Sequence, residues 1–409
     1  MTPPAVPANR KLALAFIFIT VLLDSIGFGI ILPVMPQLIM EVTGEELSRA
    51  AVIGGWLVFL YASMNFFMSP VMGNLSDRFG RRPVLLLTLV AYGLDYILMG
   101  WAPTLIWLVI GRLISGATSS TYSIANAYIA DIFPPEERAK NFALMGAAFG
   151  GGFILGPVLG GFLGELGPRV PFYATAVLAL TNAAFGFFVL PETLAKENRR
   201  PFEWRRANPL GALRHLRKYP LVFGLVGAYF VFMVAHQALP SVWAYFTIAN
   251  FDWSQREIGL SLGFAGVLMM ISQAFLIRWS IDLFGQVRTA YIGLTCAAAS
   301  YLGYAFSTET WMVYLFLLVG AGQGFLGPAV QGIMSSRVPA NAQGELQGGL
   351  GSMVSLAAIV SPPVMTGVFG YFTGPSAPVY YPGASYLLAG LLVLVSFGLF
   401  LPHLRAKSG

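Results

Sequence analysis

Residues 12–39 read LALAFIFITVLLDSIGFGIILPVMPQLI, and Asp24 is the only charged residue among them. An α-helix rises 1.5 Å per residue, so about 20 such residues cross the roughly 30 Å apolar core of a bilayer. The run shows none of the alternation that a strand of a membrane barrel requires. It therefore predicts a membrane-spanning helix, and we expect it to be retained because it is too long for the apolar core of a signal peptide.

Similar apolar runs recur along the whole chain of 409 residues. Apolar residues make up 56% of the sequence and charged residues only 10%, whereas about 25% charged residues is usual in soluble proteins. A soluble chain of this length would need more charges to cover its surface, so we predict an all-α membrane protein. The twelve predicted spans are 12–39, 50–72, 83–102, 104–130, 141–165, 171–191, 220–249, 257–277, 289–306, 310–334, 344–371 and 383–402.

The basic residues predict the orientation of these spans, because the cytoplasmic loops of membrane proteins are enriched in Lys and Arg. Of the 24 Lys and Arg residues, 20 fall on the side that holds both termini, three fall on the opposite side, and Arg112 lies inside a span. Both termini are therefore predicted to be cytoplasmic. The formal net charge of +6 follows from this topology and indicates contact with anionic lipid headgroups rather than with nucleic acid.

One long polar stretch, residues 192–219, divides the spans into two sets of six. We therefore predict an N-terminal six-helix half over 1–191, a cytoplasmic central linker over 192–219 and a C-terminal six-helix half over 220–409. An arrangement of two similar halves is typical of transporters in which the halves rock about a central binding site.

Two loops at corresponding places in these halves resemble each other. The loop after the second span reads GNLSDRFGRR (73–82), and the loop after the eighth span reads RWSIDLFGQV (278–287). The matched pairs are Asp77 with Asp282 and Gly80 with Gly285. Because both matches fall at the same topological position, they indicate an internal repeat.

The loop GNLSDRFGRR also resembles the signature loop of the major facilitator superfamily, a family of polytopic transporters. The resemblance implies the major facilitator fold, with twelve transmembrane helices in two halves. It further implies that Gly73 lets the second span approach a neighbour closely. Asp77 would face the N-terminus of the eleventh span, whose dipole favours an anion, and Arg81 would bind carboxylates, with Asp131 as its expected partner. A set of charges that only orients the loop is the alternative.

Three further stretches resemble motifs of the same superfamily. LVIGRLISG (108–116), centred on Arg112, resembles the fourth-span motif, and DIFPPEER (131–138) resembles the loop that follows it. Residues 152–160 resemble the fifth-span motif of antiporters, in which small residues and a proline allow close packing and a bend. Ordinary packing of a glycine-rich helix is the alternative for that stretch. Together these resemblances imply a conformational gate built from Gly73, Asp77, Gly80, Arg81, Asp131, Arg138, Gly152, Gly156, Pro157 and Gly160.

Within the superfamily, SDRFGRRPVLLL (76–87) and the following Asp95 in the third span resemble the tetracycline-efflux branch. The second half departs from that branch. Its ninth span reads TCAAA at 295–299, where tetracycline exporters typically carry an acidic residue, and Met269 and Met270 stand where some members have histidine. The resemblance therefore implies drug export, by a chain whose second half differs from those exporters.

Three charged residues, Asp24, Asp95 and Arg112, lie deep within the predicted spans. A charge at the bilayer centre costs about 2.5–3.5 kcal/mol on insertion scales, so such residues are expected to be functional. The two acids lie about 12 residues, roughly 18 Å, from the cytoplasmic ends of their spans, and Arg112 lies at a similar depth. Because a carboxyl group in low dielectric takes up a proton more readily, we predict that these three residues couple transport to protons, with Asp24 as the principal acid. An Asp95–Arg112 pair that only fixes helix packing is the alternative.

Uncharged polar and aromatic residues within the spans suggest the lining of a cavity. An aromatic wall with a few hydrogen-bonding groups suits a flat, amphiphilic ligand. Each of these residues could instead form a hydrogen bond between helices. The predicted substrate-binding residues are Asp24, Asn65, Tyr122, Asn126, His236, Gln237, Trp243 and Gln331.

Taken together, these patterns predict a secondary active transporter that exports small amphiphilic drugs, tetracycline-like compounds included, in exchange for protons. Proton-coupled uptake of a sugar or another metabolite is the alternative. The sequence contains no Walker loop, no His-Glu-x-x-His and no Gly-x-Ser-x-Gly, so neither a nucleotide-driven pump nor an enzyme is indicated. We expect no cofactor and no resident metal, although the substrate could carry Mg²⁺. We expect a monomer in the cell inner membrane that crosses it many times.

Overall fold

The computed structural model describes residues 10–203, 219–339 and 342–405, and the regular structure within these ranges is entirely helical. The predicted all-α class is confirmed. The chain divides into two compact units, which are described separately below.

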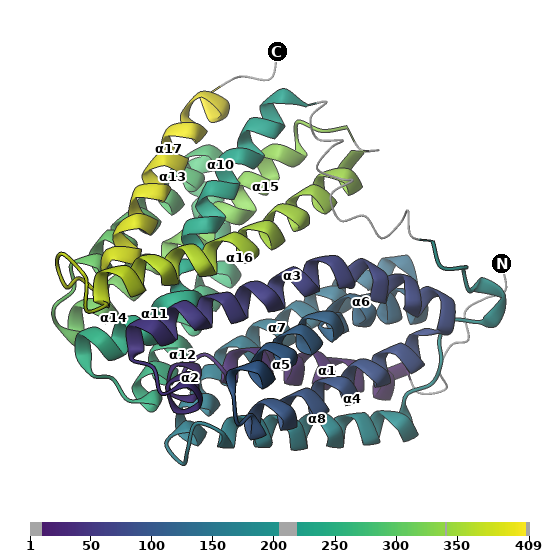
Figure 1. Cartoon of the computed structure of the whole chain (residues 1–409). Helices are drawn as coiled ribbons and strands as arrows, with labels where there is room; N and C mark the ends of the chain where they lie inside the picture. The colour runs from purple at the N-terminus through teal and green to yellow at the C-terminus, as the bar shows by residue number, and fades with distance from the viewer. Residues whose placement is uncertain (1–9, 204–218, 340–341, 406–409) are drawn as a thin grey trace. The chain divides into compact units, whose positions relative to one another are not determined.

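Unit 1 comprises Met1–Gly44, Leu60–Asn208 and Gln255–Gly263. In this unit α1 packs along α7 and α4 packs along α8 (Figure 1). Its apolar core contains Phe16 of α1, Leu85 of α4 and Tyr128 of α6, all fully buried. The helices of the unit are α1 (Arg10–Ile30), α2 (Met35–Thr43), most of α3 (Leu47–Phe79), α4 (Arg81–Trp101), α5 (Leu105–Thr118), α6 (Thr121–Ile132), α7 (Pro135–Gly164), α8 (Val170–Val189), the short η1 (Lys196–Asn198) and the start of α12 (Gln255–Ile271).

Unit 2 comprises Glu45–Phe59, Pro209–Ser254 and Phe264–Gly409. Within it α17 packs against both α10 and α13. Its core is aromatic, because Trp243 lies edge-on against the rings of Tyr304 and Tyr386. The helices of the unit are the first turns of α3, α10 (Pro220–His236), α11 (Ala238–Phe251), the rest of α12, η3 (Ser272–Leu276), α13 (Ile277–Ala305), α14 (Thr310–Gly320), η4 (Ala321–Phe325), α15 (Leu326–Ser335), α16 (Gln343–Thr373) and α17 (Ala384–Arg405).

The helices reproduce the twelve predicted spans, although not one for one. Ten helical runs in the described ranges are long and apolar enough to cross a membrane. One of them, Gln255–Ala305, contains two predicted spans and bends at Gly285, whose φ is 75°. The predicted span 104–130 is missing from the ten because α5 and α6 share it and neither is long enough alone.

Several spans predicted as single helices are interrupted, and proline explains most of the interruptions. A proline lacks an N–H and clashes with the carbonyl four residues earlier. Pro240 therefore ends α10 at His236, and Pro328 follows the tight segment η4. No proline accompanies the break between α5 and α6, where four consecutive hydroxyl residues, 118–121, compete for backbone hydrogen bonds. The interruptions fall at residues 31–34, 119–120, 237, 272–276 and 321–325.

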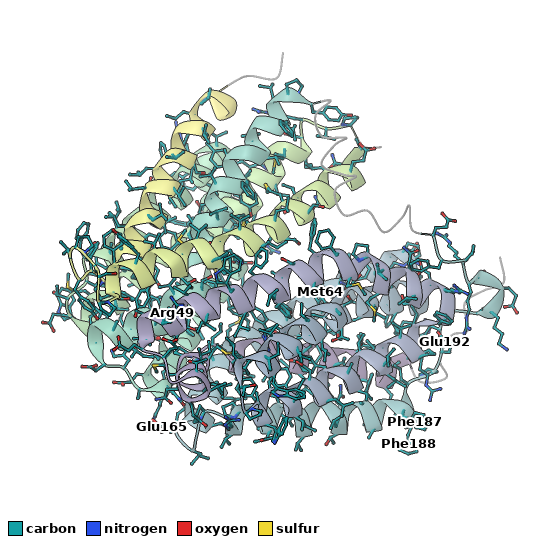
Figure 2. The ribbon with its side chains drawn as sticks, in the orientation of Figure 1. Arg49, Met64, Glu165, Phe187, Phe188 and Glu192 are labelled. Atoms are coloured by element: carbon teal, nitrogen blue, oxygen red, sulfur yellow. The ribbon has the colours of Figure 1, made fainter. Side chains whose placement is uncertain are left out.

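Large apolar side chains cover the outside of the helices. Phe187 and Phe188 project from the end of α8 (Figure 2), and their exposed fractions are 60% and 84%. Exposure of such side chains along many helices is unusual for a soluble monomer. It is expected where hydrocarbon takes the place of water as the solvent around the helices.

Candidate functional site

Unit 1 encloses a cavity of about 450 Å³ among α1, α3, α4, α5, α6 and α7. Four of the residues predicted from sequence lie on its wall, namely Asp24, Asn65, Arg112 and Tyr122. The wall is mainly apolar and aromatic, with these few polar groups set into it. Such a composition is typical of sites that bind drug-sized molecules.

Asp24 is placed in the cavity by α1, half-buried beside the first turn of α6. Its side chain interacts with Thr121, the residue that opens α6. The ring of Tyr61 lies within electrostatic range of both Asp24 and Arg112. The carboxyl group thus has one hydroxyl neighbour and an open side, and it can reach a ligand or water in the cavity.

Arg112 does not pair with either acid. Within the described ranges no carboxylate oxygen lies within 4 Å of its guanidinium. It donates from Nη2 to the sulfur of Met99 at 2.7 Å and lies 5.7 Å from the centre of the Tyr61 ring. Its Nε is buried without a partner among the residues that the structure describes. A guanidinium held in this way keeps hydrogen-bonding capacity for an anionic or carbonyl group in the cavity.

Asp95 lies behind the cavity wall, with an exposed fraction of 1%. The hydroxyl of Ser115, which does line the cavity, donates to Oδ2 of Asp95. Its other carboxylate oxygen is buried without a partner. Asp95 and Arg112 therefore form no direct ion pair within the described ranges, although the Arg112 charge still acts on the Asp95 carboxyl group, and Ser115 supplies its hydrogen bond. Asp95 can reach the cavity only through that hydroxyl group.

The break between α5 and α6 supplies polar groups that the sequence pattern did not identify. The carbonyl oxygen of Ser119 accepts a hydrogen bond from Nδ2 of Asn65 at 3.0 Å, and the Ser119 hydroxyl lies 2.7 Å from that of Tyr61. The signal in the sequence was the run of four hydroxyl residues within an apolar span. It shows where a span breaks, but it does not show which helices the freed groups meet.

Aromatic rings form the rest of the wall. Tyr122 meets Phe149 edge-on with 5.7 Å between ring centres, and Phe28 lies 6.0 Å from Tyr61. Both Tyr122 and Phe149 have exposed fractions of at least 40%. Two rings left open in this way can stack on a flat ligand.

Several predicted substrate-binding residues lie elsewhere. Asn126, on α6, has a buried side-chain oxygen without a partner in the described ranges and is absent from the cavity wall. Trp243 is fully buried in the aromatic core of unit 2. Gln331 donates to Gln347 at 2.7 Å, and Gln237 is the residue between α10 and α11.

His236 belongs to a separate polar cluster in unit 2. Its Nδ1 lies 3.2 Å from Oε1 of Gln323, and the hydroxyl of Tyr301 donates to the same oxygen at 3.0 Å. Because an amide oxygen only accepts hydrogen bonds, Nδ1 is the donor in this contact. Gln323 and Tyr301 were not predicted from sequence; Gln323 lies in the tight segment η4, and Tyr301 lies on α13.

The ion pair expected at the signature loop is present. Arg81 donates from Nε to Asp131 at 3.1 Å and from Nη1 to Asp77 at 2.5 Å and to Ser76 at 2.7 Å. The guanidinium therefore joins the end of α3 to the end of α6. Arg138 donates from Nε to the carbonyl oxygen of Phe133 and so fixes the turn before α7.

The two glycines of the loop have different surroundings. A Cβ added at Gly73 would meet no atom within 4 Å, so the predicted close approach does not occur there in this structure. Gly80 has a φ of 108°, which favours glycine, and a Cβ there would collide with the Glu192 carboxylate. Glu192, just beyond α8 (Figure 2), accepts a hydrogen bond from the Arg81 backbone N–H at 2.9 Å. The matched Gly285 also has a positive φ, of 75°.

Three glycines of α7, Gly152, Gly156 and Gly160, face α1. A Cβ at Gly152 would come within 2.6 Å of the Leu22 carbonyl oxygen, and one at Gly156 within 2.5 Å of the Ile26 carbonyl oxygen. Gly160 similarly faces the backbone of α1, and the ring of Pro157 packs against Gly29. These small residues therefore let the backbones of α1 and α7 come into contact, which holds α1 and its Asp24 against α7.

Comparisons with known proteins extend over nearly the whole chain. The family described as Major Facilitator Superfamily matches residues 17–362 and 244–408. The chain is 37% identical to the tetracycline resistance protein, class C, of Escherichia coli over 96% of each chain. It is 26% identical to multidrug resistance protein 2 of Bacillus subtilis (strain 168), over 91% of this chain and 90% of that protein. The crystal structure of the human organic anion transporter MFSD10 (TETRAN) superposes with a TM-score of 0.69 at 24% identity, over 96% of this chain and 99% of that one.

Proposed function

The chain belongs to the Major Facilitator Superfamily, and we propose that it exports small amphiphilic drugs in exchange for protons. It has the major facilitator fold, and it is a multi-pass transporter of the cell inner membrane that acts on a small molecule. The observation that carries the proposal is the unit 1 cavity, in which Asp24 and Arg112 are set among open aromatic rings.

The cavity favours a flat ligand that carries both polar and charged groups. Tyr122 and Phe149 offer ring faces for stacking, whereas Asp24 suits a cationic or hydrogen-donating group. Arg112 suits a carbonyl, enolate or other electron-rich oxygen of the same molecule. Tetracycline, with or without Mg²⁺, has this combination and is the substrate that we would test first.

Exchange follows if Asp24 holds either a proton or the drug. Asp24 takes up a proton while the cavity is open to the periplasm. When the cavity opens to the cytoplasm, the carboxyl group releases that proton, and the resulting carboxylate then binds the drug. Ser115 connects the cavity to Asp95, which gives the proton a second acceptor within hydrogen-bonding reach. We prefer export to uptake because two relatives that are similar over most of the chain are named as resistance proteins.

A direct test uses inverted membrane vesicles with an acidic lumen. If the chain exchanges drug for protons, adding tetracycline with magnesium should alkalinise the lumen, as reported by a trapped pH-sensitive dye. Vesicles without the protein provide the baseline, and a panel of other amphiphilic drugs tests the breadth of the substrate range. Acidification of the lumen with any drug, or a proton flux driven only by sugars, would contradict drug export.

The aromatic wall predicts a specific change in drug affinity. We expect Tyr122→Ala to raise the half-saturating drug concentration about fivefold, because a ring stack contributes roughly 1 kcal/mol. Tyr173→Ala is a matched control, since Tyr173 on α8 is exposed to the same extent, 41% against 40%, but does not line the cavity. Equal effects of the two substitutions would show that Tyr122 does not contact the drug.

The Arg81 network predicts a change in turnover without a change in drug affinity. We expect Arg81→Gln and Asp131→Asn each to slow transport about tenfold, a cost of 1.4 kcal/mol in the conformational step. Because the two side chains form one ion pair, the double variant should be no slower than the slower single variant. Multiplicative slowing, measured as initial rates in vesicles, would mean that the pair does not act as a unit.

A further inference from the structure

A second cavity, of about 1180 Å³, lies in unit 1 next to the Arg81 network. Its wall is formed by the start of α1, the end of α3, the link between α6 and α7, and residues 194–200. The arginines on this wall are Arg10, Arg81, Arg138, Arg199 and Arg200, and the acids are Asp77, Asp131 and Glu197. We call it the arginine cavity.

The acids on the wall do not neutralise these arginines. Asp77 and Asp131 are both bound to Arg81. Arg199 lies 3.8 Å from Glu192, and its Nε is buried without a partner in the described part of the chain.

The three remaining arginines have still fewer contacts. Arg138 uses only Nε, for the Phe133 carbonyl oxygen. Among the residues that the structure describes, the side chains of Arg10 and Arg200 have no partner. With Glu192 included, the five arginines therefore face four carboxylates, and the two exposed arginines, Arg10 and Arg200, form no ion pair within the described ranges.

The nearby acids Glu136, Glu137 and Glu203 are exposed and do not line the cavity. Residues 1–9 contain no charged side chain, and residues 204–218 contain five Lys and Arg and no Asp or Glu. Arginines that serve only to orient a membrane protein need no cavity and remain fully hydrated. Here Arg10, Arg138, Arg199 and Arg200 line one cavity, and Nε of Arg199 is withdrawn from solvent. We therefore expect an anion from outside the chain to bind there.

We propose that the arginine cavity binds a phosphate-bearing anion, supplied by a phospholipid headgroup or by a soluble phosphate ester. The planar fork of a guanidinium matches a phosphate group bidentately, and several forks around one group provide both charge and direction. Arg10 opens α1, so the cavity lies where a headgroup of the cytoplasmic leaflet is expected, and it is equally open to a soluble anion. The occupant would also lie beside Asp131 and Arg81. This site is distinct from the drug cavity, and it does not depend on the proposed function.

The test measures binding to the purified full-length chain in an uncharged detergent. The probes are dihexanoyl phosphatidylglycerol, dihexanoyl phosphatidylcholine and inorganic pyrophosphate, titrated calorimetrically at low and moderate salt. The variant is the double substitution Arg10→Gln with Arg200→Gln, which removes two charges that have no partner in the described ranges. The matched control is Arg78→Gln with Lys140→Gln, which removes two exposed charges from nearby segments that do not line the cavity.

We expect an anionic probe to bind, and its affinity should fall as the salt concentration rises. The affinity should also fall about tenfold in the Arg10/Arg200 variant but not in the control. Phosphatidylglycerol alone would identify a lipid as the source, and pyrophosphate alone would identify a soluble anion. Equal binding of phosphatidylcholine, equal losses in both variants, or no binding of either anionic probe would overturn the proposal. Both variants keep the residues of the drug cavity, so drug binding serves as a check that they are folded.

Discussion

Asp24→Asn is expected to abolish drug-driven alkalinisation of inverted vesicles. The amide keeps the size of the side chain and its contact with Thr121, but it cannot take up and release a proton. A carboxylate that carries the exchanged proton has no substitute on the cavity wall, because Asp24 is the only acid that lines it among the residues the structure describes. Dye response in the lumen and drug accumulation should fall together, to the level of vesicles that lack the protein.

The conservative variant and the second acid separate the roles of the two carboxyl groups. Asp24→Glu keeps a titratable group and should retain part of the proton flux. Asp95→Asn should slow exchange without abolishing it, because Asp95 reaches the cavity only through Ser115. Full proton exchange by the Asp24→Asn variant would remove this residue from the mechanism. Loss of drug binding together with retained proton leak would make Asp24 a ligand rather than the coupling acid.

Gly156→Ala is expected to destabilise the protein strongly, although alanine is intrinsically about 1 kcal/mol better than glycine in a helix. The new Cβ would approach the Ile26 carbonyl oxygen to 2.5 Å and the Gly29 Cα to 2.9 Å. Both are backbone atoms of α1 that cannot swing aside, so α1 must move away from α7. Overpacking of this kind costs roughly 1–3 kcal/mol, and we expect a thermal unfolding midpoint several degrees lower in detergent.

Gly150→Ala is the matched control for this substitution. It lies on the same helix, and a Cβ at Gly150 would meet no atom within 4 Å. Its stability should be unchanged or slightly increased, as helix propensity alone predicts. If the two variants unfold at the same temperature, the packing of α1 on α7 is looser than the structure indicates. A displaced α1 would also move Asp24, so Gly156→Ala should lose transport as well.

Much of this architecture is determined by the sequence. Long apolar runs require helices in a membrane, because unpaired backbone groups cannot be left in hydrocarbon. The distribution of Lys and Arg predicted the topology, and the ordered loop motif predicted the family. Four cavity residues could be predicted from sequence, because polar side chains deep in a membrane protein face its interior rather than the lipid. They are Asp24, Asn65, Arg112 and Tyr122. The Arg81–Asp131 pair was likewise expected and is present.

Only the tertiary structure decided which of the deep polar groups meet. A depth along a helix does not give the direction of a side chain around its axis, so Asp95 was a candidate partner of Arg112 but lies against Ser115. Trp243 was a plausible cavity residue and is instead buried among aromatic rings, because α11 turns it inward. The break after Thr118, which frees the Ser119 carbonyl for Asn65, arises without a proline to mark it. Sequence patterns thus determine burial and depth, whereas the rotation of each helix and the points at which helices break are settled by packing against neighbours far away in the chain.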